Sequence, residues 1–231
     1  MKVSVVVTCK GRRSQLQKTI PLHIEHAPTF DWELIVVDYG CPGQAFEWVQ
    51  ELNHPSIRAV KVLDNTEYFN LSRGRNIGAA HAEGEYVAFC DADVYPRGPW
   101  LQTIVQAVEP AGVAMCRPKW KRGGCGICCL PLDTYNRIRG HDEALEGWGW
   151  EDIDLKCRAA AEGEIVCYDA KLIGVLKHSR TASVQFYKDK RVRKGFPVTN
   201  GINKKKSRQR KGLPNPAGFG QGDFEVWRPT V

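Results

Sequence analysis

The sequence predicts an α/β protein, with a mainly parallel, twisted sheet flanked by helices and a basic C-terminal extension. Short apolar, β-branched runs alternate with helical stretches in the first half of the chain, as in repeated strand-helix-strand units. Polar residues directly follow several of these runs, as at the carboxyl edge of a parallel sheet. A chain of 231 residues, 42% of them hydrophobic, is long enough to bury a core of its own. It contains no apolar run long enough to cross a bilayer.

Four strands are expected in the first half, because four short runs are rich in β-branched and other apolar side chains. They are residues 3–8, 34–37, 57–62 and 85–90. Helices are expected after residue 13 and over 46–52 and 70–82. Ser14 is the expected cap of the first helix, and Pro21 lies awkwardly inside it. Right-handed crossovers between parallel strands would place Thr8, Asp38 and Asp91 at one edge of the sheet.

The elements of the second half are expected to be shorter. Strands are predicted at 113–116, 126–130, 165–168 and 172–176, and helices at 100–108, 132–138 and 151–161. From about residue 185 to residue 222 the hydrophobic periodicity ends, and Pro, Gly, Asn and basic residues dominate. We therefore expect one domain over 1–184, with halves at 1–95 and 96–184, and a basic tail over 185–231 that is flexible or becomes ordered only on a partner.

The positive charge is concentrated in that tail. Between Lys188 and Lys211 the sequence has eleven Lys or Arg residues and one acid, Asp189, a local net charge of +10. The remaining 22 basic and 25 acidic residues leave the rest of the chain mildly acidic. A polyanion is the natural partner of such a segment, either nucleic acid or an anionic membrane surface that presents a lipid-linked glycan. A solvated basic tail without a specific partner is the alternative.

The first apolar run, at 3–8, is too short for the hydrophobic region of a signal peptide and is predicted as a buried strand. Nine cysteines, an odd number without a signal peptide, indicate reduced thiols rather than a disulfide framework. The expected location is therefore the cytoplasm.

Two aspartates follow the fourth expected strand. Asp91 and Asp93 are separated by one residue, so their side chains point the same way if the strand conformation continues. Carboxylates suit hard divalent cations, and a nucleotide diphosphate would supply further oxygen ligands. The pattern predicts a site for Mn²⁺ or Mg²⁺, and a solvated turn after the strand is the alternative.

The stretch at 147–155 reads GWGWEDIDL. Trp148 and Trp150 offer flat apolar surfaces for a sugar ring, and the glycines beside them let a ligand approach closely. Glu151 and Asp152 begin the next expected helix, where the helix dipole favours negative charge. Either carboxylate could accept a proton from a hydroxyl group. The alternative is that both tryptophans are core residues.

A family resemblance rests on several segments in a fixed order. The chain contains SVVVTCKGR, ELIVVDYG, LSRGRNIGAAHAEGEYVAFCDADVYP, Gly123-Gly124, IRGHDEALEGWGWEDIDL and LKHSR. Together they resemble the landmarks of the GT-A glycosyltransferases, and the second half is most similar to the beta-1,4-galactosyltransferases and related bacterial or phage enzymes. The resemblance covers approximately residues 3–180. It implies a Rossmann-like GT-A fold, with a nucleotide-sugar half at 1–95 and an acceptor half at 96–184.

The resemblance also implies roles for individual residues. It assigns donor contacts to Thr8, Arg12, Arg13, Asp38, Arg75 and Asn76. It assigns metal binding to Asp93, with Asp91 nearby, and to His178 of the segment LKHSR. It makes Asp152, next to Glu151, the catalytic base.

One departure from the family pattern concerns the metal. The galactosyltransferases have a metal-binding methionine three residues before the histidine, whereas this chain has Val175, which cannot ligate a metal. Water or another side chain must then complete the coordination, which leaves the choice of metal open. The same departure makes an alternative conceivable, a catalytically inactive GT-A scaffold that binds carbohydrate or nucleic acid.

The expected function is metal-dependent transfer of a hexose from a UDP-sugar to an acceptor hydroxyl group. Direct attack on the face opposite the diphosphate would invert the anomeric centre. Trp148 or Trp150 would stack on a sugar or on another flat group. The acceptor is expected to be either a hydroxymethylated base in DNA, reached with the help of residues 188–211, or a saccharide.

Overall fold

The computed structural model describes residues 1–119, 126–177, 185–188, 196–210 and 213–230. The strands of its main sheet are β1 (Lys2–Cys9), β2 (Asp31–Asp38), β3 (Ile57–Val62), β4 (Tyr86–Asp91), β6 (Val113–Lys119), β7 (Cys128–Pro131), β8 (Glu164–Asp169) and β10 (Phe224–Trp227). Their order across the sheet is β10-β3-β2-β1-β4-β7-β6-β8. Strands β1 to β4 are parallel, whereas β7 and β10 run antiparallel to their neighbours. The mainly parallel sheet expected from the sequence is therefore confirmed.

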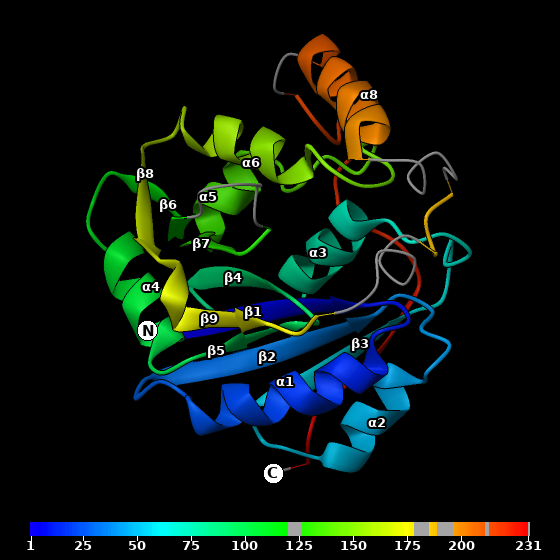
Figure 1. Ribbon diagram of the computed structural model, residues 1–231, viewed down its shortest axis with the longest axis vertical. Coiled ribbons are helices and arrows are strands. Elements are labelled where there is room, and N and C mark those ends of the chain that lie inside the picture. Colours follow the sequence, from blue (N-terminus) through cyan, green and yellow to red (C-terminus); the bar gives the residue numbers. More distant parts are fainter. Residues whose placement is uncertain (120–125, 178–184, 189–195, 211–212, 231) are drawn as a thin grey trace.

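Helices cover both faces of this sheet (Figure 1). The helices on one face are α1 (Arg13–Glu25), α2 (Ala45–Leu52) and α4 (Trp100–Val108). Those on the other face are α3 (Leu71–Ala80), α5 (Leu132–Arg137) and α6 (Glu151–Ala159). A short 3-10 helix, η1 (Ala170–Leu172), precedes β9 (Ile173–Val175), which pairs with β5 (Val94–Pro96) in a separate two-stranded sheet.

The core explains why the central strands are continuous apolar runs. In β1, Val5 and Val7 pack with the helices of one face, while Val6 packs with those of the other. A strand covered on both sides buries side chains of both alternations, so it lacks the apolar-polar alternation of a half-exposed strand. This burial on both faces stabilises the parallel arrangement.

The ends of β1, β2 and β4 lie together at the edge of the sheet where Thr8, Asp38 and Asp91 were expected. In the register of β1 with its two neighbours, Cys9 lies beside Asp38 and Thr8 lies beside Asp91. Polar residues that are far apart in the sequence therefore meet at the carboxyl edge of the parallel strands.

All strands and helices expected between residues 3 and 176 are present, with ends that differ by a few residues. The expected cap of the first helix was wrong, because Ser14 lies inside α1 and Arg12 occupies the cap position without a capping side-chain bond. Strand β5 was not expected, since its three residues show no pattern of their own and pair only with the distant β9.

The described part of the tail contains regular structure, although the sequence predicted a segment that is flexible or ordered only on a partner. Helix α8 (Phe196–Gln209) packs against α6 (Figure 1). Strand β10 pairs with β3 at the edge of the main sheet. The sequence pattern missed α8 because its side facing the protein is polar, with Thr199 and Asn203 buried. It missed β10 because a four-residue edge strand depends on its partner rather than on its own pattern.

Candidate active site

A cavity of about 640 Å³, the main cavity, brings the two acidic motifs together. Asp91 and Asp93 line one part of it, beyond the end of β4, and Glu151 and Asp152 line another part from the first turn of α6. Arg75 of α3 contributes to the lining as well. Residues from the two predicted halves of the chain, 1–95 and 96–184, therefore face a common space.

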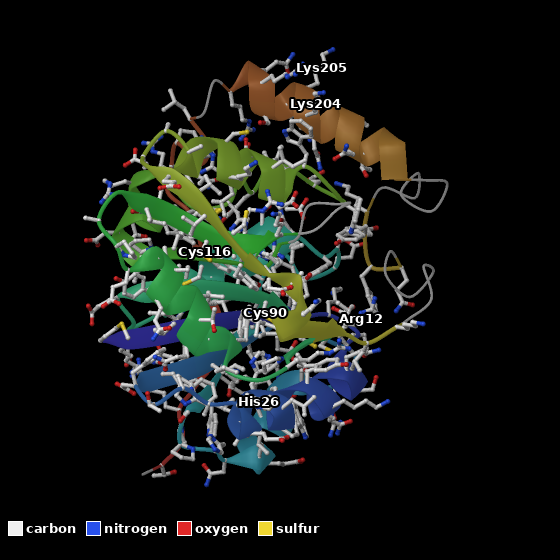
Figure 2. All side chains as sticks on the ribbon, turned by 60° about the vertical axis from the view of Figure 1, so that its left-hand side comes forward. Arg12, His26, Cys90, Cys116, Lys204 and Lys205 are labelled. Atoms are coloured by element: carbon white, nitrogen blue, oxygen red, sulfur yellow. The ribbon has the colours of Figure 1, made fainter. Side chains whose placement is uncertain are left out.

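A smaller pocket of about 170 Å³, the β1 pocket, adjoins the main cavity. Thr8, Lys10 and Arg12 line it, and Asp91 and Asp93 line both spaces. Arg12 is labelled in Figure 2, where it follows the end of β1. Lys10 is buried, and its ammonium group donates to the carbonyl oxygens of Tyr39, Gly40 and Thr66.

Arg12 beside the two carboxylates suits a diphosphate that binds together with a divalent cation.

The loop before α6 has left-handed backbone conformations at three positions. Gly147 (φ 82°) and Gly149 (φ 97°) adopt them without steric cost, whereas Trp150 (φ 76°) does so as a strained residue. Trp148 and Trp150 are half-buried and both line the main cavity, and Trp148 also packs against Tyr187. The Lys204 ammonium lies 5.1 Å from the centroid of the Trp150 ring, within cation-π distance.

Helix α8 holds this loop in place with its polar side. Thr199 Oγ1 donates a 2.7 Å hydrogen bond to the carbonyl oxygen of Trp148. Asn203 Nδ2 donates to the carbonyl oxygens of Glu146 and Gly149, at 3.0 and 2.8 Å. One turn further on, Ser207 donates to Asp154 of α6. The helix therefore satisfies backbone groups of an irregular loop that has no secondary-structure partner of its own.

Sequence reasoning missed this role of α8. Thr199, Asn203 and Ser207 recur every four residues, which places them on one side of a helix. A polar stripe at this spacing was the available signal, but it was hidden within a segment dominated by positive charge. Figure 2 shows part of that charge, Lys204 and Lys205, on α8.

The two carboxyl groups at the start of α6 have different environments. The pKa of Glu151 is raised to about 7, first by burial and second by the adjacent charge of Asp152, while the Arg75 guanidinium opposes the shift. Near neutral pH the Glu151 carboxyl therefore holds a proton part of the time. Such a pair allows one carboxyl group to accept a proton while the other stays neutral.

The Arg75 guanidinium connects the two acidic motifs. Its side chain is 1% exposed, Nη2 donates a 2.9 Å hydrogen bond to Asp91, and its charge also acts on Glu151 and Asp152. Within the described part of the chain, Nε and Nη1 of Arg75 have no hydrogen-bond partner. A buried donor without a partner is costly, which favours an oxygen-rich ligand beside this residue.

Three residues that the resemblance assigned to the donor lie outside the two spaces. Asp38 is 2% exposed, and its carboxylate accepts hydrogen bonds from the backbone N–H groups of Cys41 (2.6 Å) and Phe46 (2.9 Å). Asn76 is fully buried and donates to the carbonyl oxygen of His141. Arg13 donates to a loop carbonyl. Their roles in donor binding stay predictions.

The side chains present fit a hard divalent cation. Asp91 and Asp93 offer carboxylate oxygens to the same space, and the Asp91 side chain stays 40% exposed despite its bond to Arg75. Over the described ranges, no three His, Cys, Asp or Glu side chains form a complete metal site. His178 lies outside the described residues. Val175 is 43% exposed and lines the main cavity without a ligating atom, so two carboxylates leave coordination positions for diphosphate oxygens.

The sequence matches two known families. Residues 4–130 match glycosyl transferase family 2, and residues 112–180 match the N-terminal domain of galactosyltransferase. The first match spans more than half of the chain. The chain belongs to glycosyl transferase family 2. This membership confirms the class of enzyme expected from the sequence.

Relatives with assigned activities match about half of this chain. The chondroitin synthase of Escherichia coli is 29% identical over 120 residues, which are 51% of this chain and 17% of that protein. The dolichol-phosphate mannosyltransferase of Pyrococcus furiosus is 26% identical over 124 residues, which are 54% of this chain and 35% of that protein. This chain therefore spans only a minor part of their length.

Solved structures share the fold more completely. The mannosyltransferase PcManGT of Pyrobaculum calidifontis, in complex with GDP-Man and Mn²⁺, has a TM-score of 0.66 at 16% identity and covers 89% of this chain and 68% of its own. A mutant of Drosophila β1,4-galactosyltransferase 7, with manganese, UDP-Gal and xylobiose, has a TM-score of 0.59 at 15% identity and covers 90% and 79%. S. aureus TarS with UDP-GlcNAc has a TM-score of 0.65 at 15% identity and covers 79% and 61%. These likenesses confirm the GT-A fold.

The described residues contain no helix that combines the length and the apolar character needed to cross a membrane.

Proposed function

We propose that this protein transfers a hexose from a UDP-sugar to an acceptor hydroxyl group, with a divalent metal ion and with inversion at the anomeric carbon. One observation carries the proposal: the main cavity brings the acid pair of α6 and the Asp91-Asp93 motif to one space. The UDP-sugar complexes of S. aureus TarS and of Drosophila β1,4-galactosyltransferase 7 support the choice of donor.

The donor would occupy the β1 pocket and the adjoining part of the main cavity. Asp91 and Asp93 would hold Mn²⁺ or Mg²⁺, together with His178 as the resemblance implies. Bound there, the ion would neutralise charge on the leaving diphosphate. Arg12 and Arg75 add fixed positive charge on the same side, so the diphosphate would leave into a site already arranged for its charge.

The acceptor would bind on the α6 side of the main cavity. Asp152 accepts the proton of the acceptor hydroxyl as its oxygen attacks the anomeric carbon on the face opposite the diphosphate. The bond from that carbon to the diphosphate breaks, and UDP leaves. Glu151, whose pKa is raised to about 7, keeps the adjacent position partly neutral and so limits the repulsion felt by Asp152. Trp148 and Trp150 supply flat apolar surfaces on which a sugar ring or another flat group of the acceptor can stack.

The sequence favours two acceptor classes, a hydroxymethylated base in DNA and a saccharide. The solvent side of α8 favours an anionic partner of either class, since Lys205 and Arg208 are exposed there. A gel-shift experiment with duplex DNA tests the first class. Binding that weakens steeply as the salt concentration rises would support a DNA acceptor, and no binding at low salt would exclude it.

A panel of UDP-sugars tests the proposal. The wild type should hydrolyse at least one of them slowly in the presence of Mn²⁺ or Mg²⁺, and Asp93→Ala should abolish that hydrolysis. Asp152→Asn should retain UDP binding but lose transfer to an acceptor by about 10²-fold or more. A wild type that hydrolyses no donor would instead favour the inactive binding scaffold, and an Asp152→Asn variant with full transfer activity would remove Asp152 as the base.

A further inference from the structure

A second pocket opens beside Asp152, between α6 and strands β6 and β7. This α6 pocket has a volume of about 290 Å³, and Arg117, His141 and Lys156 line it. Asp152 and Ile153 line both the α6 pocket and the main cavity. The carboxyl group proposed as the base therefore stands where the two spaces meet. Neither the family match nor the resemblance assigns a ligand to this pocket.

Two buried polar atoms in the α6 pocket lack a partner. His141 is 1% exposed; its Nδ1 lies 2.8 Å from the Tyr135 hydroxyl, but its Nε2 has no hydrogen-bond partner among the residues described. The same is true of Nε of Arg117. Buried polar atoms normally have partners, and each one left without a partner costs about 1–3 kcal/mol. A ligand that supplies oxygen atoms would remove this cost.

The charge of the α6 pocket favours an anionic ligand. Arg117 and Lys156 are cationic, and Asp152 is the one carboxylate among the described lining residues. His141 adds no charge, because burial and the nearby guanidinium groups of Arg75 and Arg158 hold its pKa well below its ordinary value. The imidazole is therefore a neutral hydrogen-bonding group beside two cations.

The spacing along α6 sets the size of the ligand. Lys156 follows Asp152 by four residues, so the two side chains share one side of the helix about 6 Å apart along its axis. One pyranose ring can bridge this span, with a hydroxyl group at Asp152 and a charged substituent at Lys156. A longer ligand would have to leave the pocket.

We propose that the α6 pocket binds the acceptor as an acidic sugar residue. Its carboxylate or phosphate group contacts Lys156 and Arg117, and a further oxygen contacts His141. The hydroxyl group that reacts lies at Asp152, where the α6 pocket meets the main cavity, and so faces the donor. This inference rests on the proposed function, because it takes Asp152 as the base. It deepens that function by choosing a negatively charged saccharide over a neutral one and over DNA.

Direct binding tests the inference independently of catalysis. The probes are methyl glucuronide, glucose 6-phosphate and the neutral methyl glucoside, titrated into the full chain and followed by NMR. The wild type should bind at least one acidic sugar about tenfold or more tightly than methyl glucoside, as expected for charge-assisted hydrogen bonds. The two acidic probes distinguish a carboxylate from a phosphate.

Three variants test whether the preference for an acidic sugar arises in the α6 pocket. Lys156→Gln and Arg117→Gln should each reduce the preference for the acidic sugar toward equality, while UDP affinity stays as in the wild type. Lys18→Gln removes the same charge from the exposed side of α1, on the opposite face of the sheet from α6, and should leave the preference intact. Because two pocket residues are substituted separately, the test still works if one of the two variants does not fold.

Four outcomes would overturn the inference. They are equal binding of acidic and neutral sugars by the wild type, a preference that survives both pocket substitutions, a preference lost equally in Lys18→Gln, and glucosylation of hydroxymethylated duplex DNA with no binding of any sugar probe. Failure of the proposed function is a separate result, because it would appear as absent UDP-sugar hydrolysis while sugar binding could still be measured.

Discussion

Asn203 of α8 donates a 2.8 Å hydrogen bond to the carbonyl oxygen of Gly149, in the loop that carries both tryptophans. The same amide group reaches the carbonyl oxygen of Glu146, and the Asn203 residue is 1% exposed. A helix from the segment expected to be an irregular tail thus holds the loop next to the acid pair. The position of the proposed acceptor surface therefore depends on residues far along the chain.

We predict that Asn203→Ala weakens acceptor use without weakening donor binding. The substitution leaves two loop carbonyl oxygens without their donor, at a cost of about 1–3 kcal/mol. The loop then loses its fixed position, and kcat/KM for the acceptor should fall by about tenfold or more. Steady-state kinetics and UDP titration measure the two effects. Gln209→Ala, at an exposed position of the same helix, is the matched control, and acceptor kinetics unchanged in Asn203→Ala would contradict the assigned role.

We predict that Glu151 makes the protein less stable as pH rises from about 4.5 to about 7. Its pKa is raised from 4.5 to about 7 in the folded state, so between these values the folded state binds more protons than the unfolded state. Stability must then decrease with increasing pH in this window, by at most about 3 kcal/mol. Glu151→Gln should lack that slope. Chemical unfolding at a series of pH values, without added metal, checks this, and parallel slopes in both proteins would refute it.

We predict that Arg75→Gln raises the pKa of Glu151 further. The guanidinium charge opposes the upward shift, and its removal leaves burial and the Asp152 charge unopposed. Carboxyl titration by carbon-detected NMR should show a higher midpoint for Glu151. Arg73→Gln is the matched control, because Arg73 lies on the same helix but forms its ion pair with Asp64, at 2.8 Å. An unchanged midpoint in Arg75→Gln would show that Arg75 does not act on Glu151.

We predict opposite effects of alanine at two helical glycines. A Cβ atom at Gly78 of α3 would overlap the side chain of Val6 in β1, so Gly78→Ala should destabilise the protein by about 1–3 kcal/mol. A Cβ atom at Gly201 of α8 meets nothing within 4 Å, so Gly201→Ala should stabilise α8 by up to about 1 kcal/mol. Thermal unfolding compares the two. A Gly78→Ala variant as stable as the wild type would mean that α3 does not pack as closely on β1 as described.

Much of the fold was predictable because its signals are local. The buried strands are continuous apolar runs, and Asp38 and Asp91 directly follow apolar stretches, so the carboxyl edge of the sheet could be located from the hydrophobic pattern. The stretch around Trp148 and Asp152 was also recognisable, because its composition is unusual. The GT-A resemblance then linked these stretches in the correct order.

The rest of the site depends on contacts between distant segments. Nothing local indicates that Arg75 is buried between the two acidic motifs, or that Gly126 must lack a side chain to leave room for it. Basic residues elsewhere on α8 concealed the polar stripe of Thr199, Asn203 and Ser207. Nothing in the sequence around Lys156 marks it as a ligand-binding residue. The folded chain places it in the α6 pocket together with Arg117 of β6.

By itself, the sequence determined the parallel core, the strand ends that carry Thr8 and Asp91, and the acidic start of α6, because burial and helix-end electrostatics depend on neighbouring residues. Only the tertiary structure decided that α8 supports the tryptophan loop and that Asp152 stands between two cavities. The physical reason is that hydrogen bonds to irregular backbone and unpaired buried donors depend on which distant segments meet. The hydrophobic periodicity of the sequence does not show which distant segments come into contact.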